Sequence, residues 1–365
     1  MAQCFICHQA SPFISQGLNL CHNCIKNSWE EALPLIRDAH QKSRKAFGLP
    51  LKVSAAQGGI SCHLCINECK IAEDERGYCG LRKNDHGVFR GVTNRHGNLS
   101  WYHDPLPTNC VASWVCPGGT GAGYPLYAFR DGPEYGFKNL AVFFHGCSMN
   151  CLFCQNWHFR KLTLKPPKIS INDLMAALDE STACICYFGG DPTPQLPYAI
   201  EAAKVALTKK KGGILRICWE TNGTFHSSWV EEMTLLSAKT GGSIKFDLKA
   251  WDERVHLALT GTTKERTYTN FALVAERAKK RKEPPLLVAS TLLIPGYIDE
   301  EEVRHIAQFI ASLDRDIPYA LLGFYPQFYM ADLPPTPKDL AYRCLAVAEE
   351  EGLTRVHLGN VHLFS

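Results

Sequence analysis

Three cysteines with the spacing C-x3-C-x2-C are the residues of this chain best suited to chemistry. Cys147, Cys151 and Cys154 follow directly after an apolar run at residues 140–144. Three thiolates on one short loop can hold three irons of a cubane iron–sulfur cluster. Because the loop has no fourth cysteine, the fourth iron would stay open to a ligand that is not protein. The alternatives are a tight loop of reduced thiols and one half of a zinc knuckle.

Seventeen cysteines in 365 residues are the clearest feature of the composition. The chain starts without a basic and apolar signal segment, so we expect a cytoplasmic protein whose cysteines bind metals rather than form disulfides. Ten cysteines precede residue 120, which places the extra metal sites in the N-terminal part. The last four lie in apolar runs and are interpreted as small buried hydrophobic residues: Cys184, Cys186, Cys218 and Cys344.

The charge balance argues against two classes of partner. A formal net charge of +3 is too small to indicate nucleic-acid binding, which disfavours a zinc-bearing nucleic-acid modifier. No apolar run approaches the roughly 20 residues of a membrane span. We therefore expect neither a nucleic acid nor a membrane among the partners.

Two further cysteine sets precede the cluster loop. The first has two C-x2-C pairs thirteen residues apart, which suits tetrahedral zinc, although a rubredoxin-like iron or an iron–sulfur cluster has the same donors. A helix is expected to follow at residues 28–47. The second set could hold zinc or an auxiliary [4Fe–4S] cluster, and its position beside the cluster loop favours the cluster. The first set is Cys4, Cys7, Cys21 and Cys24; the second is Cys62, Cys65, Cys69 and Cys79.

The segment at residues 99–135 has no clear interpretation. It is rich in glycine, proline and aromatic residues and contains Cys110 and Cys116, a C-x5-C pair that is unusual for zinc. The pair could complete a metal site with other cysteines, face the active site or belong to a packed loop.

From residue 140 onward, apolar runs alternate with helical patterns. Six strand–helix units with apolar strands imply a parallel sheet buried on both sides, and six units are too few for a closed barrel of eight. We therefore predict an α/β fold, a partial (β/α)6 barrel, with a small N-terminal cysteine-rich metal-binding region. The expected domains are residues 1–50 (zinc knuckle plus helix), 51–135 (second metal-binding region and loop) and 136–365 (barrel). The runs are 140–144, 184–188, 214–219, 243–248, 286–294 and 319–325.

Two helices of this part carry end signals. Asp299 with Glu302 predicts a capping box for a helix over 299–314. Thr336 as the cap, with proline next and Gly352 beyond the end, predicts a helix over about 337–350.

The cluster spacing and the strand ends together resemble the radical S-adenosylmethionine (SAM) superfamily, in the branch similar to pyruvate formate-lyase activating enzymes. The third, fourth and fifth strands end in Thr-Asn-Gly, Asp-Leu-Lys and Ile-Pro-Gly, similar to the family's motifs. At the second strand end Asp191 stands where the family has glutamate. The histidine that activating enzymes carry after the sixth strand has no counterpart in Tyr325-Pro326.

The resemblance implies a role for each matching residue. Lys249 would contact the SAM carboxylate, Phe153 and Ile294 would lie near adenine, and the strand-end backbone at Gly189-Gly190 would receive the amino group. The catalytic residues would be Cys147, Cys151 and Cys154, and the cofactor-binding residues Phe153, Gly189, Gly190, Asp191, Asn222, Asp247, Lys249 and Ile294.

The resemblance also implies a function. A [4Fe–4S] cluster would cleave SAM reductively to a 5′-deoxyadenosyl radical, which abstracts hydrogen from a protein or peptide substrate. The enzyme would be an anaerobic oxidoreductase that performs glycyl-radical activation or another post-translational modification, with a flavodoxin- or ferredoxin-type electron donor. The alternatives are a cobalamin-dependent radical SAM C-methyltransferase acting on a peptide or protein, and a non-catalytic iron–sulfur scaffold or electron carrier. No motif specifies the substrate.

Overall fold

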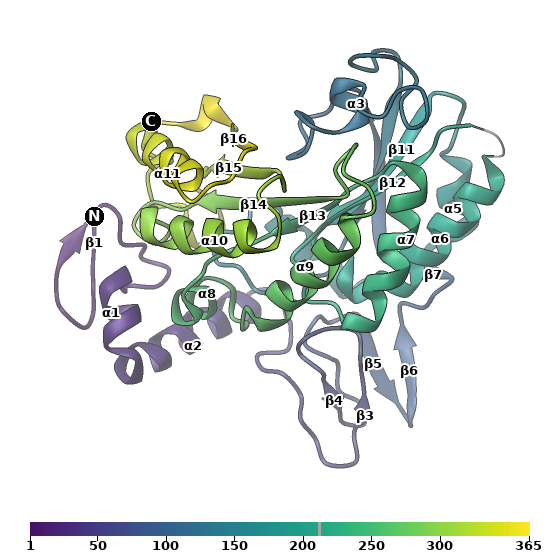
Figure 1. Cartoon of the computed structure of the whole chain (residues 1–365). Coiled ribbons are helices and arrows are strands. Elements are labelled where there is room, and N and C mark those ends of the chain that lie inside the picture. Colours follow the sequence, from purple (N-terminus) through teal and green to yellow (C-terminus); the bar gives the residue numbers. More distant parts are fainter. Residues whose placement is uncertain (211–212) are drawn as a thin grey trace.

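The computed structural model describes residues 1–210 and 213–365 as an α/β fold around one central sheet (Figure 1). The strand order is β16-β15-β14-β13-β12-β11-β9-β8. Every neighbouring pair from β9 to β16 is parallel, and β8 alone runs antiparallel, at one edge. The strands are β8 (Leu99–Pro105), β9 (Lys138–Phe144), β11 (Thr182–Gly189), β12 (Arg216–Thr221), β13 (Ile244–Asp247), β14 (Leu287–Leu293), β15 (Tyr319–Gly323) and β16 (Val356–Gly359).

The six predicted strand–helix units are confirmed, and so is the partial barrel that they form. Two strands were not expected. β16 continues the parallel sheet beyond β15, and β8 pairs along the whole of β9, from Leu99 beside Phe144 to Pro105 beside Lys138. β8 belongs to the segment at residues 99–135 for which the sequence suggested only a loop. It therefore ties that segment to the barrel.

Helices cover the outer face of the sheet, as Figure 1 shows. Alternate strand residues such as Ile185, Ile217 and Trp219 are buried in the core against them, because successive side chains point to opposite faces. In the described ranges no helix is long and apolar enough to cross a membrane. The helices are α4 (Arg160–Thr163), α5 (Ile171–Ala176), α6 (Leu196–Lys209), α7 (Val230–Thr240), α8 (Glu253–Thr260), α9 (Glu265–Ala278), α10 (Glu300–Leu313) and α11 (Lys338–Glu350).

The end signals of α10 and α11 are only partly as predicted. Asp299 caps α10 by accepting a hydrogen bond from the Glu302 backbone at 3.0 Å, but the Glu302 carboxylate does not complete the box. It accepts instead from the Trp251 and Asp252 backbone before α8. The prediction of a Thr336 cap is wrong. Its hydroxyl donates to the Leu293 carbonyl and accepts from the Phe324 amide, both at 2.7 Å, because it joins the ends of β14 and β15.

The N-terminal part packs against the same end of the barrel as the cluster loop. Tyr297 accepts from the Ser15 amide and donates to the Leu20 carbonyl, both at 3.0 Å. Helix α2 lies where residues 28–47 predicted a helix. The division into domains at residues 50 and 135 stays a prediction. The elements are β1 (Ala2–Gln3), β2 (Ala10–Ser11), α1 (His22–Asn27), α2 (Trp29–Lys45), β3 (Ile60–Ser61), β4 (Lys70–Ile71), β5 (Arg82–Asp85), β6 (Val88–Gly91), β7 (His96–Gly97, paired with β10, Ile169–Ser170) and α3 (Pro117–Thr120).

Candidate active site

A pocket of about 200 Å³ lies at the carboxyl ends of β9, β11, β12 and β13. Parallel strands that end at one edge bring their terminal residues together, which is where (β/α) barrels carry their chemistry. The pocket contains the cluster loop and nearly all the residues expected to bind the cofactor. These are Cys147, Cys151, Cys154, Phe153, Gly189, Gly190, Asp191, Asn222, Asp247 and Lys249.

The cluster loop is held by backbone hydrogen bonds. The amides of Asn150 and Leu152 donate to the carbonyls of Thr260 and Leu259, at 2.8 and 3.0 Å. The Leu152 carbonyl accepts from the Tyr329 amide at 2.9 Å. The loop thus has partners on both sides, which fixes the positions of the three thiols.

The thiols suit an iron–sulfur cluster in their number and surroundings. The Cys147 sulfur accepts from the Met149 amide at 3.4 Å and from the Asn222 side chain at 3.5 Å. Such N–H donors stabilise a thiolate that ligates iron. Burial raises the pKa of Cys151 to about 12, and the Lys249 ammonium opposes that shift. The metal-free thiol of Cys151 would therefore stay protonated near neutral pH, and ligation would release its proton.

Asp191 joins the ends of two strands. Its carboxylate accepts from the backbone amides of Thr193 and Asn222, at 2.8 and 2.7 Å. Burial raises the pKa of Asp191 to about 6, although these hydrogen bonds act to lower it. Next to it, Gly190 must be glycine, because a Cβ there would lie 2.4 Å from the Gly146 carbonyl oxygen of the cluster loop. Asp191 therefore positions the Gly189-Gly190 backbone and Asn222 beside the cluster cysteines.

Lys249 and Asp247 form a partly exposed ion pair at the end of β13, with 15% and 43% of their side chains exposed. The ammonium lies 2.7 Å from the Asp247 carboxylate and 5.6 Å from the centre of the Phe153 ring. Burial acts to lower the pKa of Lys249, but Asp247 and Cys151 raise it above its usual value. The other Asp247 oxygen accepts from the Ser290 hydroxyl at 2.8 Å. Lys249 is thus a fixed cation that a ligand carboxylate can reach.

Ile294 lies apart from the other predicted residues. It is fully buried and does not line the pocket, whose apolar wall at this side is Leu292 and Leu322. Its expected place near adenine stays a prediction.

Two further pocket residues were not singled out from the sequence. Arg160, six residues after the last cluster cysteine, is 2% exposed, and its Nε has no hydrogen-bond partner among the described residues. Glu220 lies on β12, where every second residue faces the inside of the barrel: Arg216, Cys218 and Glu220. That alternation is a sequence signal for a lumen-facing strand, but the apolar residues between obscured it.

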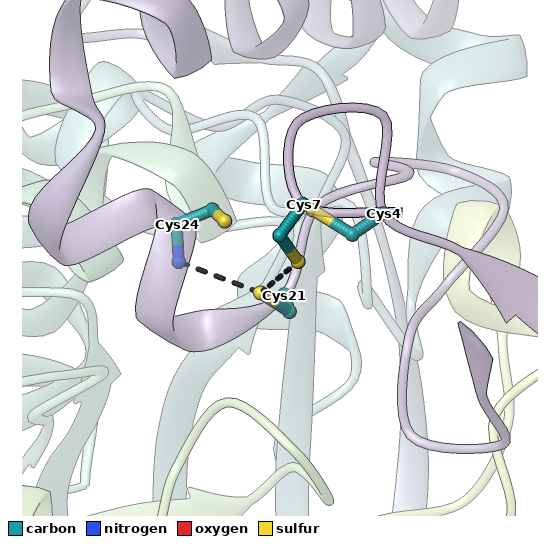
Figure 2. Close-up of side chains that lie close together, drawn as sticks. All are labelled: Cys4, Cys7, Cys21 and Cys24. Atoms are coloured by element: carbon teal, nitrogen blue, oxygen red, sulfur yellow. Dashed lines mark hydrogen bonds between the residues drawn. The ribbon is translucent and has the colours of Figure 1, made fainter. Parts of the chain in front are cut away.

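The first cysteine set forms the geometry of a metal site. Its four sulfurs all lie within 4.8 Å of one another, and Figure 2 shows the four side chains gathered at one point. The sulfurs of Cys7 and Cys21 are 3.8 Å apart, and tetrahedral zinc with bonds of about 2.3 Å spaces its sulfurs by about 3.8 Å. Burial opposes ionisation of Cys4, but the backbone amides of Cys7, Cys21 and Ile6 lower its pKa to about 6.

The second cysteine set lies beside the strand-end loop that carries Asn222. The amide of Ile66 donates to the Thr224 carbonyl at 2.9 Å, and Asn67 donates to the Ser148 carbonyl in the cluster loop at 2.7 Å. Burial raises the pKa of Cys65, and three neighbouring thiols raise it further: Cys79, Cys62 and Cys69. The four thiols are thus close neighbours, but no three of them fall within the 4.8 Å span of the first set.

The Glu302 carboxylate supports the segment after Lys249, and its shifted pKa predicts that the stability of the protein depends on pH. Burial raises its pKa from 4.5 to about 7, against the hydrogen bonds from Trp251 and Asp252. Between these pH values the folded protein holds more protons than the unfolded chain, so stability falls as pH rises, by about 3 kcal/mol in total. We expect the free energy of unfolding of Glu302→Gln, relative to that of wild type, to increase by about 3 kcal/mol between pH 4.5 and 7.5. Urea unfolding under nitrogen measures this difference, and a pH-independent difference would contradict it.

Residues 141–310 match the family model of the radical SAM superfamily. An uncharacterised protein of Methanocaldococcus jannaschii is 26% identical over 83% of this chain and 81% of its own length. A putative glycyl-radical enzyme activating enzyme of the same organism is 27% identical over 57% of this chain and 76% of its own length. The pyruvate formate-lyase 1-activating enzyme of Escherichia coli K12 is 22% identical, over 61% of this chain and 92% of its own length.

The family match covers most of β9, the cluster loop and the strands from β11 to β14 with their carboxyl ends at the pocket. The comparisons thus give a radical SAM domain match at residues 141–310, relatives named as glycyl-radical and pyruvate formate-lyase activating enzymes, and an N-terminal cysteine cluster that precedes the matched residues.

Proposed function

We propose that this protein is a radical SAM enzyme that abstracts hydrogen from a protein or peptide substrate. The observation that carries the proposal is the convergence of three loop cysteines, a Gly-Gly strand end and the Lys249 ammonium on one pocket. Cys147, Cys151 and Cys154 would hold a [4Fe–4S] cluster. That cluster with SAM supplies one-electron reductive cleavage and radical hydrogen abstraction.

In this proposal the residues of the chain bind SAM, orient it and shield it from water. Lys249 offers its ammonium to the SAM carboxylate, and Asp247 holds that ammonium in place. The Gly189-Gly190 backbone receives the amino group, and Phe153 with the wall of Leu292 and Leu322 forms the apolar side for adenine. Asn222 donates to the Cys147 sulfur. The buried walls exclude water, which strengthens each of these contacts.

The substrate class rests on the relatives. Two of them are named as activating enzymes, one putatively for glycyl-radical enzymes and one for pyruvate formate-lyase. We extend this to a glycyl-radical enzyme or another protein or peptide as the substrate here, with a flavodoxin- or ferredoxin-type electron donor in the cytoplasm. Zinc at the first cysteine set and a second iron–sulfur cluster at Cys62, Cys65, Cys69 and Cys79 complete the proposed metal content.

Formation of 5′-deoxyadenosine tests the reaction. The reconstituted protein with SAM and dithionite should form it slowly alone and faster with its substrate, and a substrate deuterated at glycine should pass deuterium into it. A protein that binds SAM without cleaving it would instead be the non-catalytic scaffold. An optical spectrum of bound cobalamin after iron chelation would favour the C-methyltransferase.

Lys249→Met should weaken SAM binding by at least about tenfold, because a charge-assisted contact with the SAM carboxylate is lost and Asp247 remains unpaired. Isothermal titration of the reconstituted variant with SAM measures the affinity, and its iron content should stay at the wild-type value. Lys204→Met, which breaks an ion pair with Glu232 on the outer helices, is the matched control. Equal SAM affinity of wild type and Lys249→Met would remove the assigned role.

A further inference from the structure

A second cavity lies inside the barrel, at the opposite end of the strands from the cluster loop. Its volume is about 360 Å³. The inner faces of β9, β11, β12 and β13 form its wall, and the segment after β8 covers it. Figure 1 shows α3 and its flanking loops at this end, away from the β3–β6 hairpins.

Five cysteine thiols line this cavity. Cys186 on β11 stands beside Cys218 on β12 in the parallel register, and Cys110 and Cys116 come from the covering segment. Cys184 lies one inward position earlier on β11. The interpretation of the last four cysteines as buried hydrophobic residues is confirmed for Cys344, Cys184 and Cys186, although the latter two also face the cavity, whereas Cys218 is only half-buried.

A buried lysine donates to two of these sulfurs. The Lys245 side chain is 4% exposed, and its Nζ lies 3.1 Å from the Cys110 sulfur, 3.2 Å from the Cys186 sulfur and 2.9 Å from a Glu220 oxygen. A neutral thiol is a weak acceptor for a buried ammonium, whereas a metal-bound thiolate is a strong one. Lysine N–H···S contacts suit ligated sulfur, and the Cys110 thiol, which donates to the Glu220 carboxylate at 3.2 Å, would lose that proton on ligation.

The sulfurs are spread too widely for a single ion. Among the described residues, only the N-terminal set has three or more ligand atoms within 4.8 Å of one another. A wider set of thiols facing one void suits a cluster of several irons better than tetrahedral zinc. The cations of the cavity are also already paired, Lys245 with Glu220 and Arg216 with the buried Glu134. That pairing disfavours an organic anion as the occupant.

We propose that this cavity holds an additional iron–sulfur cluster, ligated by the covering pair Cys110 and Cys116 and the strand pair Cys186 and Cys218. Lys245 donates hydrogen bonds to two of the ligating sulfurs. Glu220 lines both this cavity and the pocket of the cluster loop, so the two sites are neighbours in the barrel. The site does not depend on the proposed function, since it could be loaded without SAM.

The test starts from a parent variant that cannot hold the SAM cluster, Cys147→Ala/Cys151→Ala/Cys154→Ala. Iron and sulfide per chain are measured in this variant after anaerobic reconstitution. Adding Cys186→Ser/Cys218→Ser should remove roughly two to four irons and as many sulfides per chain. Cys344→Ser is the matched buried control and should remove none. Because both N-terminal cysteine sets are unchanged, their metals cancel in the comparison. Equal iron in all three proteins, or a loss of zinc without iron, overturns the proposal.

Two further variants separate ligation from misfolding. Cys110→Ser/Cys116→Ser changes the covering segment instead of the strands and should cause the same loss of iron, with the N-terminal metal retained as a sign of a folded chain. Lys245→Met in the parent should keep the iron but lower the reduction potential of the cluster, because N–H···S bonds and a positive charge are removed. Full iron in the first variant, or an unchanged potential in the second, contradicts the assignment.

Discussion

Cys151→Ala is expected to form no 5′-deoxyadenosine from SAM and dithionite. Loss of an outer-shell partner of a metal site already costs about 10–100-fold, and loss of one of three ligands should cost more than about 100-fold. The loop contains no fourth cysteine whose thiolate could replace it. Chromatographic quantification of deoxyadenosine and methionine after anaerobic reconstitution measures the loss.

The matched comparison is Cys344→Ser, a cysteine buried in the core away from both cavities. It should retain wild-type turnover and iron content. If Cys151→Ala kept full activity, the cluster would be held elsewhere and the assignment of the loop would fail.

Cys7→Ser/Cys21→Ser should cost the protein one metal ion and unfold its first 27 residues. Structural zinc in small knuckles contributes roughly 10–16 kcal/mol, and so short a segment has little core of its own to replace that contribution. We therefore expect fast hydrogen exchange across residues 1–27 and a zinc content near zero at this site. Elemental analysis with exchange mass spectrometry measures both.

His8→Ala serves as the control for this pair. His8 is exposed and lies in the same loop, but it is not among the four groups that converge. It should keep the metal and slow exchange. Iron rather than zinc in the wild-type protein would identify the rubredoxin-like alternative, and slow exchange in the metal-free double variant would show that packing alone holds the segment.

Much of the barrel could be predicted because its signals are local. Apolar runs mark the strands, and the cysteine spacing marks the cluster loop. The roles of Thr336 and Glu302 could not be predicted, since each side chain meets a backbone group far away in sequence, at Leu293 and at Trp251. A helix-cap motif compares only residues that are close in sequence, so it cannot predict a side-chain hydrogen bond to a distant segment.

The cavity inside the barrel was not predicted from the sequence, for a different reason. Cysteine counts as apolar in a pattern, so Cys186 and Cys218 made β11 and β12 look buried on both faces. Glu220 and Lys245, on alternate positions of their strands, were the available sign that one face is not a packed core. Cys110 lies beside those strands because the segment after β8 folds back over the cavity. No residue spacing in the sequence predicts that fold.

The peptide group of Tyr329 has a practical consequence for work at the bench. Its N–H supports Leu152 in the cluster loop, and its carbonyl accepts from the Ser15 hydroxyl at 3.1 Å in the first cysteine loop. On the proposed assignment of zinc to the first cysteine set, chelators used in purification would strip this metal and so loosen one of the supports of the cluster loop. Protein for activity assays should therefore be isolated with zinc in the growth medium and without chelators, and a chelator-treated sample makes an unfair test of turnover.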